Sequence, residues 1–564
     1  MKKQMMTGAE AVIASLIIEG VTDLFGYPGG AIMPIYDALY GEKNKLNHLL
    51  VRHEQGAIHA AQGYARVTGK VGVVFATSGP GATNLITGLA DAQIDSTPLV
   101  CITGQVASSL LGTDAFQETD VMAIAMPVTK WQAQVRRAED IPKVIAKAFY
   151  IAKSGRPGPV IIDITKDAQF ERFEFDYEVC RSIRTYQSIP EVDLEVLDQA
   201  VDLLNKAEKP LLLIGQGILL SKAEEALNAF LEKTGIPVAS TLLGLGAVST
   251  SHPLYVGFVG MHGDYAPNLK TNECDVLLAI GMRFDDRVTG DVSRYAKQAK
   301  IIHIDIDASE LNKIIPATVA IHADAKEALE YLVSKIKSKR YDDWLLQFKL
   351  QSDYATEVLT KNLPALSSSE IRMEAVVELL SELTNGTAII VTDVGQHQMV
   401  TARNYDYKRP RTNVTSGGLG TMGFALPAAI GAKVGKSSQQ VIALIGDGGF
   451  QMTIQELGTI FQSDVAVKII ILNNRYLGMV RQWQELFFEK RYSFTEMISP
   501  DFVGVAKAYG IAGDYVENWN DLKRAITSLL EHPEAYLLEV EVLKEDNVFP
   551  MIPTGASVSE IRLQ

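Results

Sequence analysis

The chain has 564 residues, of which 47% are hydrophobic and 21% are charged, and its formal net charge is −14. This composition is typical of a globular protein with several domains and enough chain to bury large cores. The acidic balance and the lack of any basic block argue against a nucleic-acid partner.

The first twenty residues predict an amphipathic helix rather than a signal peptide. Glu10 and Glu19 interrupt the apolar stretch, and no cleavage site follows. Thr7 and Glu10 have the spacing of a capping box, which opens a helix. No segment is long and apolar enough to span a bilayer, and the three cysteines have neither disulfide-framework nor zinc-site spacing. We therefore expect a cytoplasmic protein with no membrane partner.

Short apolar runs that end in glycine alternate with helical patterns along the whole chain. Continuous runs of Val, Ile and Leu are typical of strands that are buried on both faces. Their alternation with helices predicts an α/β fold of three doubly wound domains with mainly parallel sheets. Residues 170–192 and 341–371 lack a clear period and are interpreted as linkers. The predicted units are residues 1–180, 190–340 and 365–543, followed by a tail at 544–564.

Two consecutive predicted strands in the last unit stop at small polar residues. Residues 441–445 are followed by Gly-Asp-Gly-Gly, and residues 467–472 are followed by Asn-Asn. A second capping-box spacing predicts that the helix between them starts near Thr453. In a right-handed strand–helix–strand unit both strands are parallel, and their carboxyl ends reach the sheet edge where ligands bind. Asp447 and Asn474 are therefore expected side by side at a ligand site.

The residue types at this edge favour a hard cation and a phosphate. The side-chain oxygens of Asp447 and Asn474 suit Mg²⁺ better than zinc. Gly446, Gly448 and Gly449 allow the backbone to approach a phosphate closely. Each piece alone is a common turn sequence, so it is the spacing within the strand–helix–strand frame that favours a ligand site.

Gly-Asp-Gly followed by Asn-Asn resembles the motif of thiamine-diphosphate enzymes. Longer segments, among them 283–290 (RFDDRVTG) and 479–484 (MVRQWQ), resemble the acetohydroxyacid synthase family, and the resemblance covers essentially the whole chain. It implies that Mg²⁺ is held by Asp447, Asn474 and the backbone oxygen of Tyr476. It also implies that the carboxyl group of Glu54, in VRHEQGAIHAAQGYA, hydrogen-bonds the aminopyrimidine of the cofactor. A glutamate taken alone is more often a surface residue.

The resemblance implies further site residues. The catalytic residues would be Glu54, Gly30, Phe116, Gln117 and Lys166, the last preceded by threonine where the family has proline. The residues that bind thiamine diphosphate would be Glu54, Val394, Gly395, Gln396, His397, Gly420, Met422, Gly446, Asp447, Gly448, Gly449, Asn474, Tyr476, Gly478, Met479 and Val480. The residues that bind FAD, in a non-redox role, would be Arg156, Gly215, Gly217, Thr241, Leu242, Met261, His262, Gly281, Arg283, Arg287, Asp305, Ile306, Asp324 and Ala325. Trp483 would favour 2-ketobutyrate over pyruvate as second substrate.

The activity that the resemblance implies is that of acetolactate synthase, in branched-chain amino-acid (valine, leucine and isoleucine) biosynthesis. Pyruvate is decarboxylated and the remaining unit is joined to a second pyruvate or to 2-ketobutyrate. The implied assembly is a homodimer with active sites at the interface, or a tetramer, bound by a small regulatory subunit.

Two alternatives remain open from the sequence. One is a related enzyme, either catabolic acetolactate synthase or a pyruvate oxidase. The RFDDRVTG motif argues against the former, and Trp483 argues against both. The other is a non-catalytic nucleotide-binding protein of the same fold, because a fold does not guarantee an activity. The presence of Glu54, Asp447 and Asn474 together argues against this second alternative.

Overall fold

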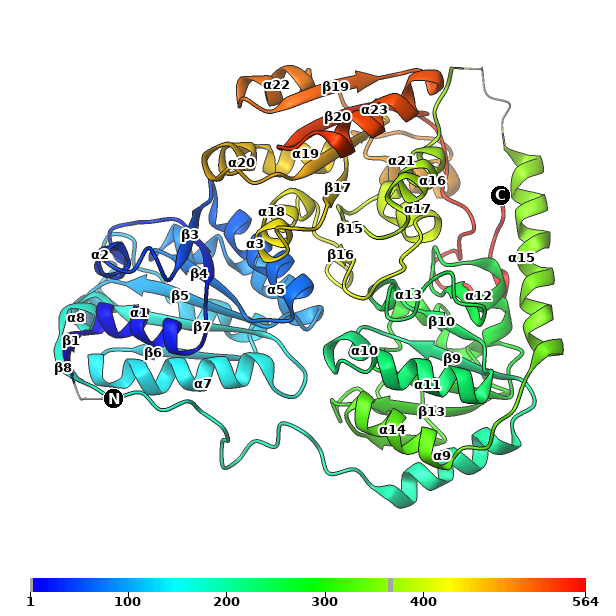
Figure 1. Ribbon diagram of the computed structural model, residues 1–564, viewed down its shortest axis with the longest axis horizontal. Helices are drawn as coiled ribbons and strands as arrows, with labels where there is room; N and C mark the ends of the chain where they lie inside the picture. Colours follow the sequence, from blue (N-terminus) through cyan, green and yellow to red (C-terminus); the bar gives the residue numbers. More distant parts are fainter. Residues whose placement is uncertain (1–3, 364–368) are drawn as a thin grey trace.

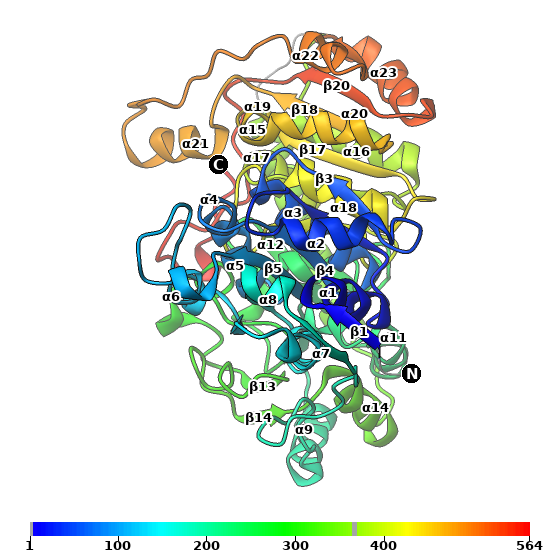
Figure 2. The same cartoon turned by 90° about the vertical axis from the view of Figure 1, so that its left-hand side faces the viewer.

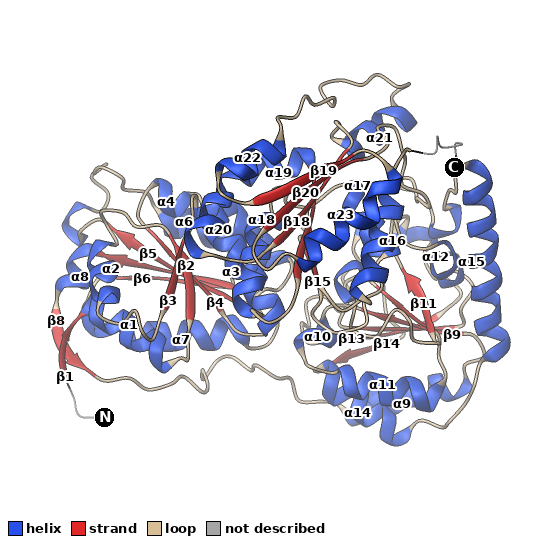
Figure 3. Ribbon diagram, turned by 45° about the horizontal axis from the view of Figure 1, so that its top comes forward, coloured by secondary structure: helices blue, strands red, loops and turns tan. Residues whose placement is uncertain are grey.

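The computed structural model describes residues 4–363 and 369–564, which form three α/β domains. The N-terminal domain is blue and cyan in Figure 1, the central domain is green, and the C-terminal domain runs from yellow to red. Each domain contains a six-stranded sheet, and Figure 3 shows helices on both sides of the strands. The predicted fold class is confirmed.

The N-terminal domain has a parallel sheet of order β3-β2-β4-β5-β7-β6. Its strands are β2 (Asp23–Gly26), β3 (Asn47–Leu50), β4 (Gly72–Ala76), β5 (Leu99–Gln105), β6 (Trp131–Val135) and β7 (Pro159–Thr165). Its longer helices are α1 (Gly8–Ile18), α2 (Met33–Tyr40), α3 (Glu54–Thr68), α5 (Ile86–Ile94) and α7 (Ile141–Lys153). The predicted capping box at the start of α1 is confirmed: Thr7 Oγ1 accepts from Glu10 N at 3.2 Å, and Thr7 N donates to Glu10 Oε2 at 2.6 Å.

The central domain has a parallel sheet of order β11-β10-β9-β12-β13-β14. Counted along the chain this is the order 3-2-1-4-5-6 of dinucleotide-binding domains. Its strands are β9 (Pro210–Ile214), β10 (Val238–Ser240), β11 (Tyr255–Phe258), β12 (Val276–Ile280), β13 (Lys300–Asp305) and β14 (Val319–His322). Its longer helices are α9 (Leu194–Lys206), α11 (Glu224–Thr234) and α14 (Ala325–Lys335).

The C-terminal domain has a parallel sheet of order β16-β15-β17-β18-β20-β19. Along the chain this order is the same as in the N-terminal domain. Its strands are β15 (Ile389–Thr392), β16 (Asn413–Thr415), β17 (Val441–Gly446), β18 (Lys468–Asn473), β19 (Ala512–Val516) and β20 (Tyr536–Glu541). Its helices are α16 (Met373–Thr384), α17 (Gln396–Asn404), α18 (Ala425–Gly435), α19 (Asp447–Thr453), α20 (Leu457–Ser463), α21 (Gly478–Phe487), α22 (Phe502–Ala508) and α23 (Trp519–Glu531).

Helices α3 and α18 join the N-terminal and C-terminal domains. Gly63 of α3 faces the backbone of Ala428, and Gly431 of α18 faces the backbone of Ala60, so a side chain at either glycine would collide with the other helix. The absence of side chains lets the two helices approach closely. A single hydrophobic cluster therefore runs through both domains.

The two predicted linkers contain regular structure. Most of the second is α15 (Asp342–Asn362), which buries Trp344 and Phe348 beside α12 (Tyr265–Thr271), while residues 364–368 lie outside the described part. The first includes β8 (Arg172–Phe175), which pairs antiparallel with β1 (Gln4–Thr7). This regular structure was not predicted, because a mostly exposed helix and a four-residue edge strand carry little hydrophobic periodicity.

The tail at 544–564 returns from the C-terminal to the central domain, as the red trace in Figure 1 shows. Ile552 N donates to Met261 O at 2.8 Å, and Arg294 forms an ion pair with Glu560 at 2.9 Å. Within residues 4–363 and 369–564, no helix combines the length and the apolar character that crossing a membrane requires.

Candidate cofactor and active site

A cavity of about 1040 Å³ lies where the three domains meet. The N-terminal domain contributes Ile94 and Arg156, and the C-terminal domain contributes Met422 and Trp483. The largest share of the wall belongs to the central domain. Every residue predicted to contact FAD lines this cavity except Gly215, which lies directly beneath it.

Three glycines of the central domain form the base of this cavity. A side chain at Gly217 would lie 2.5 Å from Gly281 Cα, and one at Gly215 would meet Gly281 O. Gly281 has a φ of +57°, which other residues rarely adopt. Because the turn after β9 and the end of β12 pass so closely, the cavity floor is bare backbone, which suits a diphosphate.

The three predicted flavin arginines differ in their partners. Arg156 is engaged by acidic groups: its guanidinium lies 3.2 Å from Asp307 and 2.7 Å from Glu310, which ties the N-terminal domain to the central one. Arg287 is mostly exposed, with Nη1 3.2 Å from Met261 Sδ. Arg283 lines the cavity. Arg283 and Arg287 are thus the better placed to meet a phosphate group.

In the C-terminal domain, the ends of β17 and β18 lie side by side. The strands are parallel neighbours, with Gly446 opposite Leu472. Asp447 is the first residue of α19, and Asn474 directly follows β18. The connection contains two helical segments: α19 begins at Asp447, earlier than predicted, and a 3-10 turn (Ile454–Glu456) that leads into α20 begins directly after Thr453, as predicted. The Thr453 hydroxyl caps no helix but donates to Gly423 O at 3.0 Å.

Asp447 has an unsatisfied carboxylate oxygen. Its side chain is 1% exposed; Oδ2 accepts from Ser499 Oγ at 3.1 Å, and Oδ1 has no donor among the described residues. Burial raises the pKa of Asp447 to about 6. Such an oxygen costs free energy unless a donor or a cation meets it. Asp447 fits a role as ligand to a hard cation.

The other candidate metal ligands at this edge are also oxygens, those of the Asn474 side chain and of the backbone. Asn474 Oδ1 accepts from Tyr476 N at 3.1 Å, and Asn474 Nδ2 donates to Gln396 Oε1 at 3.2 Å. Among residues 4–363 and 369–564, no group of three or more His, Cys, Asp or Glu side chains is placed to hold a metal. The donor set of one carboxylate, one amide and backbone carbonyls suits Mg²⁺ rather than zinc.

The loop after β15 brings polar groups to the same edge. His397 is buried, its Nε2 has no partner among the described residues, and its ring lies 3.1 Å from where a side chain at Gly446 would begin. Burial lowers the pKa of His397 to about 4, so the ring is neutral at pH 7. Gln396 Nε2 donates to Gln482 Oε1 at 2.9 Å and to Asp546 O at 2.8 Å. His397 can offer one N–H to an anion.

Two polar residues near this edge, Asp393 and Ser499, were not among the predicted site residues. Asp393 accepts from Val394 N at 2.9 Å, Gly423 N at 3.0 Å and Ala425 N at 3.0 Å, and so joins the loop after β15 to the segment with Met422. It directly follows a strand, the same signal that pointed to Asp447. The other is the Ser499 partner of Asp447, which lies 52 residues downstream and has no local signal.

Some of the residues predicted to bind thiamine diphosphate line the cavity. Those at the ends of β17 and β18, such as Asp447 and Asn474, do not. Those lining it are Val394, Gly395, Gly420, Met422, Met479 and Val480, with Trp483 beside them. The ring of Trp483 lies 5.3 Å from that of Phe487. Both aromatic residues belong to α21, which projects from the body of the molecule in Figure 2. The projecting helix α21 thus forms an outer part of the cavity wall through Met479, Val480 and Trp483.

The predicted N-terminal residues lie apart from this cavity. Glu54 is the first residue of α3, is 8% exposed, and accepts from Asn84 Nδ2 at 2.9 Å. Phe116 is 89% exposed, and Gln117 has a φ of +58°. None of Gly30, Glu54, Phe116, Gln117 and Lys166 lines the cavity. One chain therefore does not bring these residues to Met422 and Trp483.

Comparison with known proteins shows the family to which this chain belongs. Three thiamine pyrophosphate enzyme family models match: the N-terminal TPP binding domain at residues 6–124, the central domain at 197–332 and the C-terminal TPP binding domain at 393–540. The chain is 44% identical to the acetolactate synthase isozyme 2 large subunit of Escherichia coli, covering 99% of each chain. It is 44% identical to acetolactate synthase 2, chloroplastic, of Nicotiana tabacum, covering 98% of this chain and 85% of the relative. It is 44% identical to a probable acetolactate synthase large subunit of Methanocaldococcus jannaschii, covering 99% of this chain and 95% of the relative. The chain therefore belongs to the acetolactate synthase large-subunit family of thiamine-diphosphate (thiamine pyrophosphate) enzymes.

Proposed function

We propose that this protein is an acetolactate synthase of branched-chain amino-acid biosynthesis. It decarboxylates pyruvate and joins the remaining two-carbon unit to a second pyruvate or to 2-ketobutyrate. The observation that carries the proposal is similarity over nearly the whole of this chain to acetolactate synthases from a bacterium and a plant and to a probable acetolactate synthase from an archaeon. A retained fold with a lost site would be expected to lack one of Glu54, Asp447 and Asn474, and all three are present.

The strand-end residues would hold the cofactor's diphosphate through Mg²⁺. Asp447, Asn474 and the Tyr476 carbonyl would ligate the ion, and the unsatisfied Oδ1 of Asp447 supports this. His397 would lie beside the diphosphate, with its Nε2, which has no partner among the described residues, available for a hydrogen bond. When bound, thiamine diphosphate supplies the electron sink for loss of CO₂.

The other proposed residues orient the reactants and exclude water. Glu54, at the start of α3, would hold a proton at the aminopyrimidine ring. Met422 would hold the cofactor's bent shape, while Met479 and Val480 would cover its reacting side. Exclusion of water by these apolar groups would favour carbon–carbon bond formation over protonation. Trp483 would set the preference for 2-ketobutyrate.

FAD is the proposed occupant of the central part of the cavity, in a non-redox role. The dinucleotide-binding strand order and the bare backbone at Gly217 and Gly281 support it. Gly217→Ala would place a methyl group 2.5 Å from Gly281 Cα. We expect this variant to purify with much less flavin, measured by absorbance near 450 nm. Gly41→Ala, whose nearest neighbour would be 3.8 Å away, is the matched control.

The proposed assembly is a homodimer with two active sites at its interface, or a tetramer made of two such dimers. The separation of Glu54 and Phe116 from the cavity supports it, as does the near-complete exposure of Phe494 on the loop after α21. A small regulatory subunit and a cytoplasmic location are part of the same proposal.

Product analysis tests the proposed activity. The purified protein is incubated with pyruvate and 2-ketobutyrate, with Mg²⁺, thiamine diphosphate and FAD, and each is omitted in turn. We expect 2-acetolactate and 2-aceto-2-hydroxybutyrate, both dependent on thiamine diphosphate and Mg²⁺. Formation of acetate or acetaldehyde alone would contradict the proposal.

A further inference from the structure

A glycine-rich loop, residues 416–421, lies at the junction of all three domains and ends next to Met422. A side chain at Gly417 would lie 2.8 Å from Leu243 of the central domain, and one at Gly418 would lie 2.8 Å from Ile94 of the N-terminal domain. The loop is therefore clamped on both sides. Its residues 416–420 also form part of the cavity wall.

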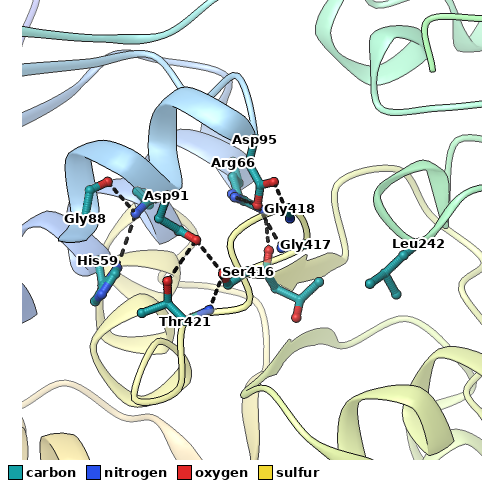
Figure 4. A network of polar contacts seen from close by, with 12 residues as sticks. His59, Arg66, Gly88, Asp91, Asp95, Leu242, Ser416, Gly417, Gly418 and Thr421 are labelled. Atoms are coloured by element: carbon teal, nitrogen blue, oxygen red, sulfur yellow. Dashed lines mark hydrogen bonds and ion pairs between the residues drawn. The ribbon is translucent and has the colours of Figure 1, made fainter. Parts of the chain in front are cut away.

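Asp95, just after α5 of the N-terminal domain, holds the backbone of this loop (Figure 4). Its Oδ2 accepts from Gly417 N at 2.8 Å, and its Oδ1 accepts from Gly418 N at 2.7 Å. Arg66 of α3 forms an ion pair with Asp95 at 2.8 Å and donates to Thr415 O at 2.5 Å. Asp95 and Arg66 are both buried, so these contacts are shielded from water.

Asp91, one helical turn earlier, holds the side chains of the same loop. Its Oδ1 accepts from the Ser416 hydroxyl and from Thr421 Oγ1, the latter at 3.2 Å. Ser416 Oγ in turn accepts from Thr421 N at 2.8 Å. The other carboxyl oxygen, Oδ2, and the neighbouring Gln62 Oε1 are buried without a donor among the described residues.

The charges around the two carboxyl groups do not balance if both are ionised. The charged or titratable groups that face them are Arg66 and His59 of α3, and the loop itself offers none. Burial lowers the pKa of His59 to about 3, so this ring is neutral and Arg66 is the single cation. Three donors already meet Asp95, whereas Asp91 Oδ2 has none. Burial and then the neighbouring Asp95 raise the pKa of Asp91 to about 6.

We propose that Asp95 is a positioning residue for thiamine diphosphate, while Asp91 supports the side chains of the same loop. Asp95 fixes the glycine-rich loop before the cofactor arrives, so that Gly420 and Met422 are in place to receive the pyrimidine ring. The inference rests on the proposed function. A loop fixed beforehand lowers the ordering cost of binding.

The test compares two isosteric variants by their thiamine diphosphate dependence. For Asp95→Asn we expect the concentration for half-maximal acetolactate formation to rise about tenfold or more. The KM for pyruvate and kcat at saturating cofactor stay within about threefold, because binding is affected rather than chemistry. For Asp91→Asn the rise is several times smaller, because the amide oxygen can still accept from Ser416 and Thr421 and the amide nitrogen can donate to Gln62 Oε1. Asp275→Asn is the control, since Asp275 also accepts from two successive backbone N–H groups, of Glu208 and Lys209, far from the cavity.

Ser416→Ala keeps the inference testable where Asp95→Asn does not fold. It removes the bridge between Asp91 and Thr421 N and is expected to raise the same concentration about threefold. Unchanged cofactor dependence in the folded variants, or an equal loss for Asp91→Asn and Asp95→Asn, would overturn the inference. A wild-type protein that forms no acetolactate would instead overturn the proposed function.

Discussion

The N-terminal and C-terminal domains have the same strand order but offer their polar groups in opposite ways. In the C-terminal domain, Asp447, Asn474 and His397 are buried at the strand ends, and Asp447 Oδ1 and His397 Nε2 have no partner among the described residues. In the N-terminal domain, Phe116 and Gly30 lie on the surface, and Glu54 lies outside the cavity that holds Trp483. These three proposed site residues of the C-terminal domain are thus buried within it, whereas two of those of the N-terminal domain lie at its surface.

This difference matches the proposal that the two domains supply complementary halves of one active site. A buried unsatisfied oxygen such as Asp447 Oδ1 is costly, so its retention is consistent with binding of an ion. An exposed aromatic ring such as Phe116 is consistent with coverage by another chain. The predictions below test each half and then their combination.

The largest expected effect belongs to the N-terminal half. Glu54→Gln removes the proposed proton-holding carboxyl group and is expected to lower kcat by about 10²–10⁴-fold, with the fold retained. Steady-state acetolactate formation and circular dichroism measure the two quantities. Glu42→Gln, at an exposed glutamate paired with Lys45, is the control. A near-normal rate of acetolactate formation by Glu54→Gln would contradict the proposed role of the N-terminal domain in the active site.

Asp163 is a buried carboxyl group outside the proposed active site, so it shows the effect of burial on protein stability without any effect on catalysis. This carboxyl group lies inside the N-terminal sheet, where Thr103 and Gln105 donate to it, and burial raises its pKa to about 6. The native state therefore binds a proton more tightly than the unfolded state. Its stabilising contribution is present below about pH 4 and is lost as pH rises through about 6, by about 1.4 kcal/mol per pKa unit.

Melting temperatures of wild type and Asp163→Asn measure this contribution. The wild type should lose stability relative to the variant between pH 4.5 and pH 7.5. Asp198→Asn, at a residue that only accepts from Tyr331 near the surface, is the control and should show no such trend. A difference that does not change with pH would contradict the assigned proton.

A smaller effect is expected in substrate choice. Trp483→Leu should lower the preference for 2-ketobutyrate over pyruvate about tenfold, because one changed apolar contact is worth only a few kcal/mol. Competition between the two substrates gives the product ratio. Trp519→Leu, at a partly exposed tryptophan of α23, should leave the ratio unchanged. An unchanged product ratio in Trp483→Leu would show that other residues determine the choice between 2-ketobutyrate and pyruvate.

Local sequence patterns predicted much of the fold and of the C-terminal half-site. Asp447 and Asn474 each follow a buried strand, and a strand–helix–strand unit brings such ends together whatever the rest of the chain does. Asp393 carries the same signal and could have been found. The helix α19 was not predicted, because its small first residues, Asp447, Gly448 and Gly449, are typical of a turn, and the predicted start near Thr453 belongs to the segment that leads into α20.

Contacts between distant segments could not be predicted in this way. Asp91 and Ser416 are 325 residues apart, and nothing near either one marks it as a partner of the other. The helix α15 was missed because most of its side chains face solvent. The separation of Glu54 from the cavity is likewise a property of the folded chain, and no spacing in the sequence encodes it.

The most direct test of the central claim is complementation between two inactive variants. Glu54→Gln and Asp447→Asn are co-expressed with different affinity tags, and the mixed species is isolated by both tags. If each site joins Glu54 of one chain to Asp447 of another, every mixed dimer has one intact site of two and should show about half the wild-type activity. Mixed dimers that are no more active than the parent variants would contradict a site shared between chains.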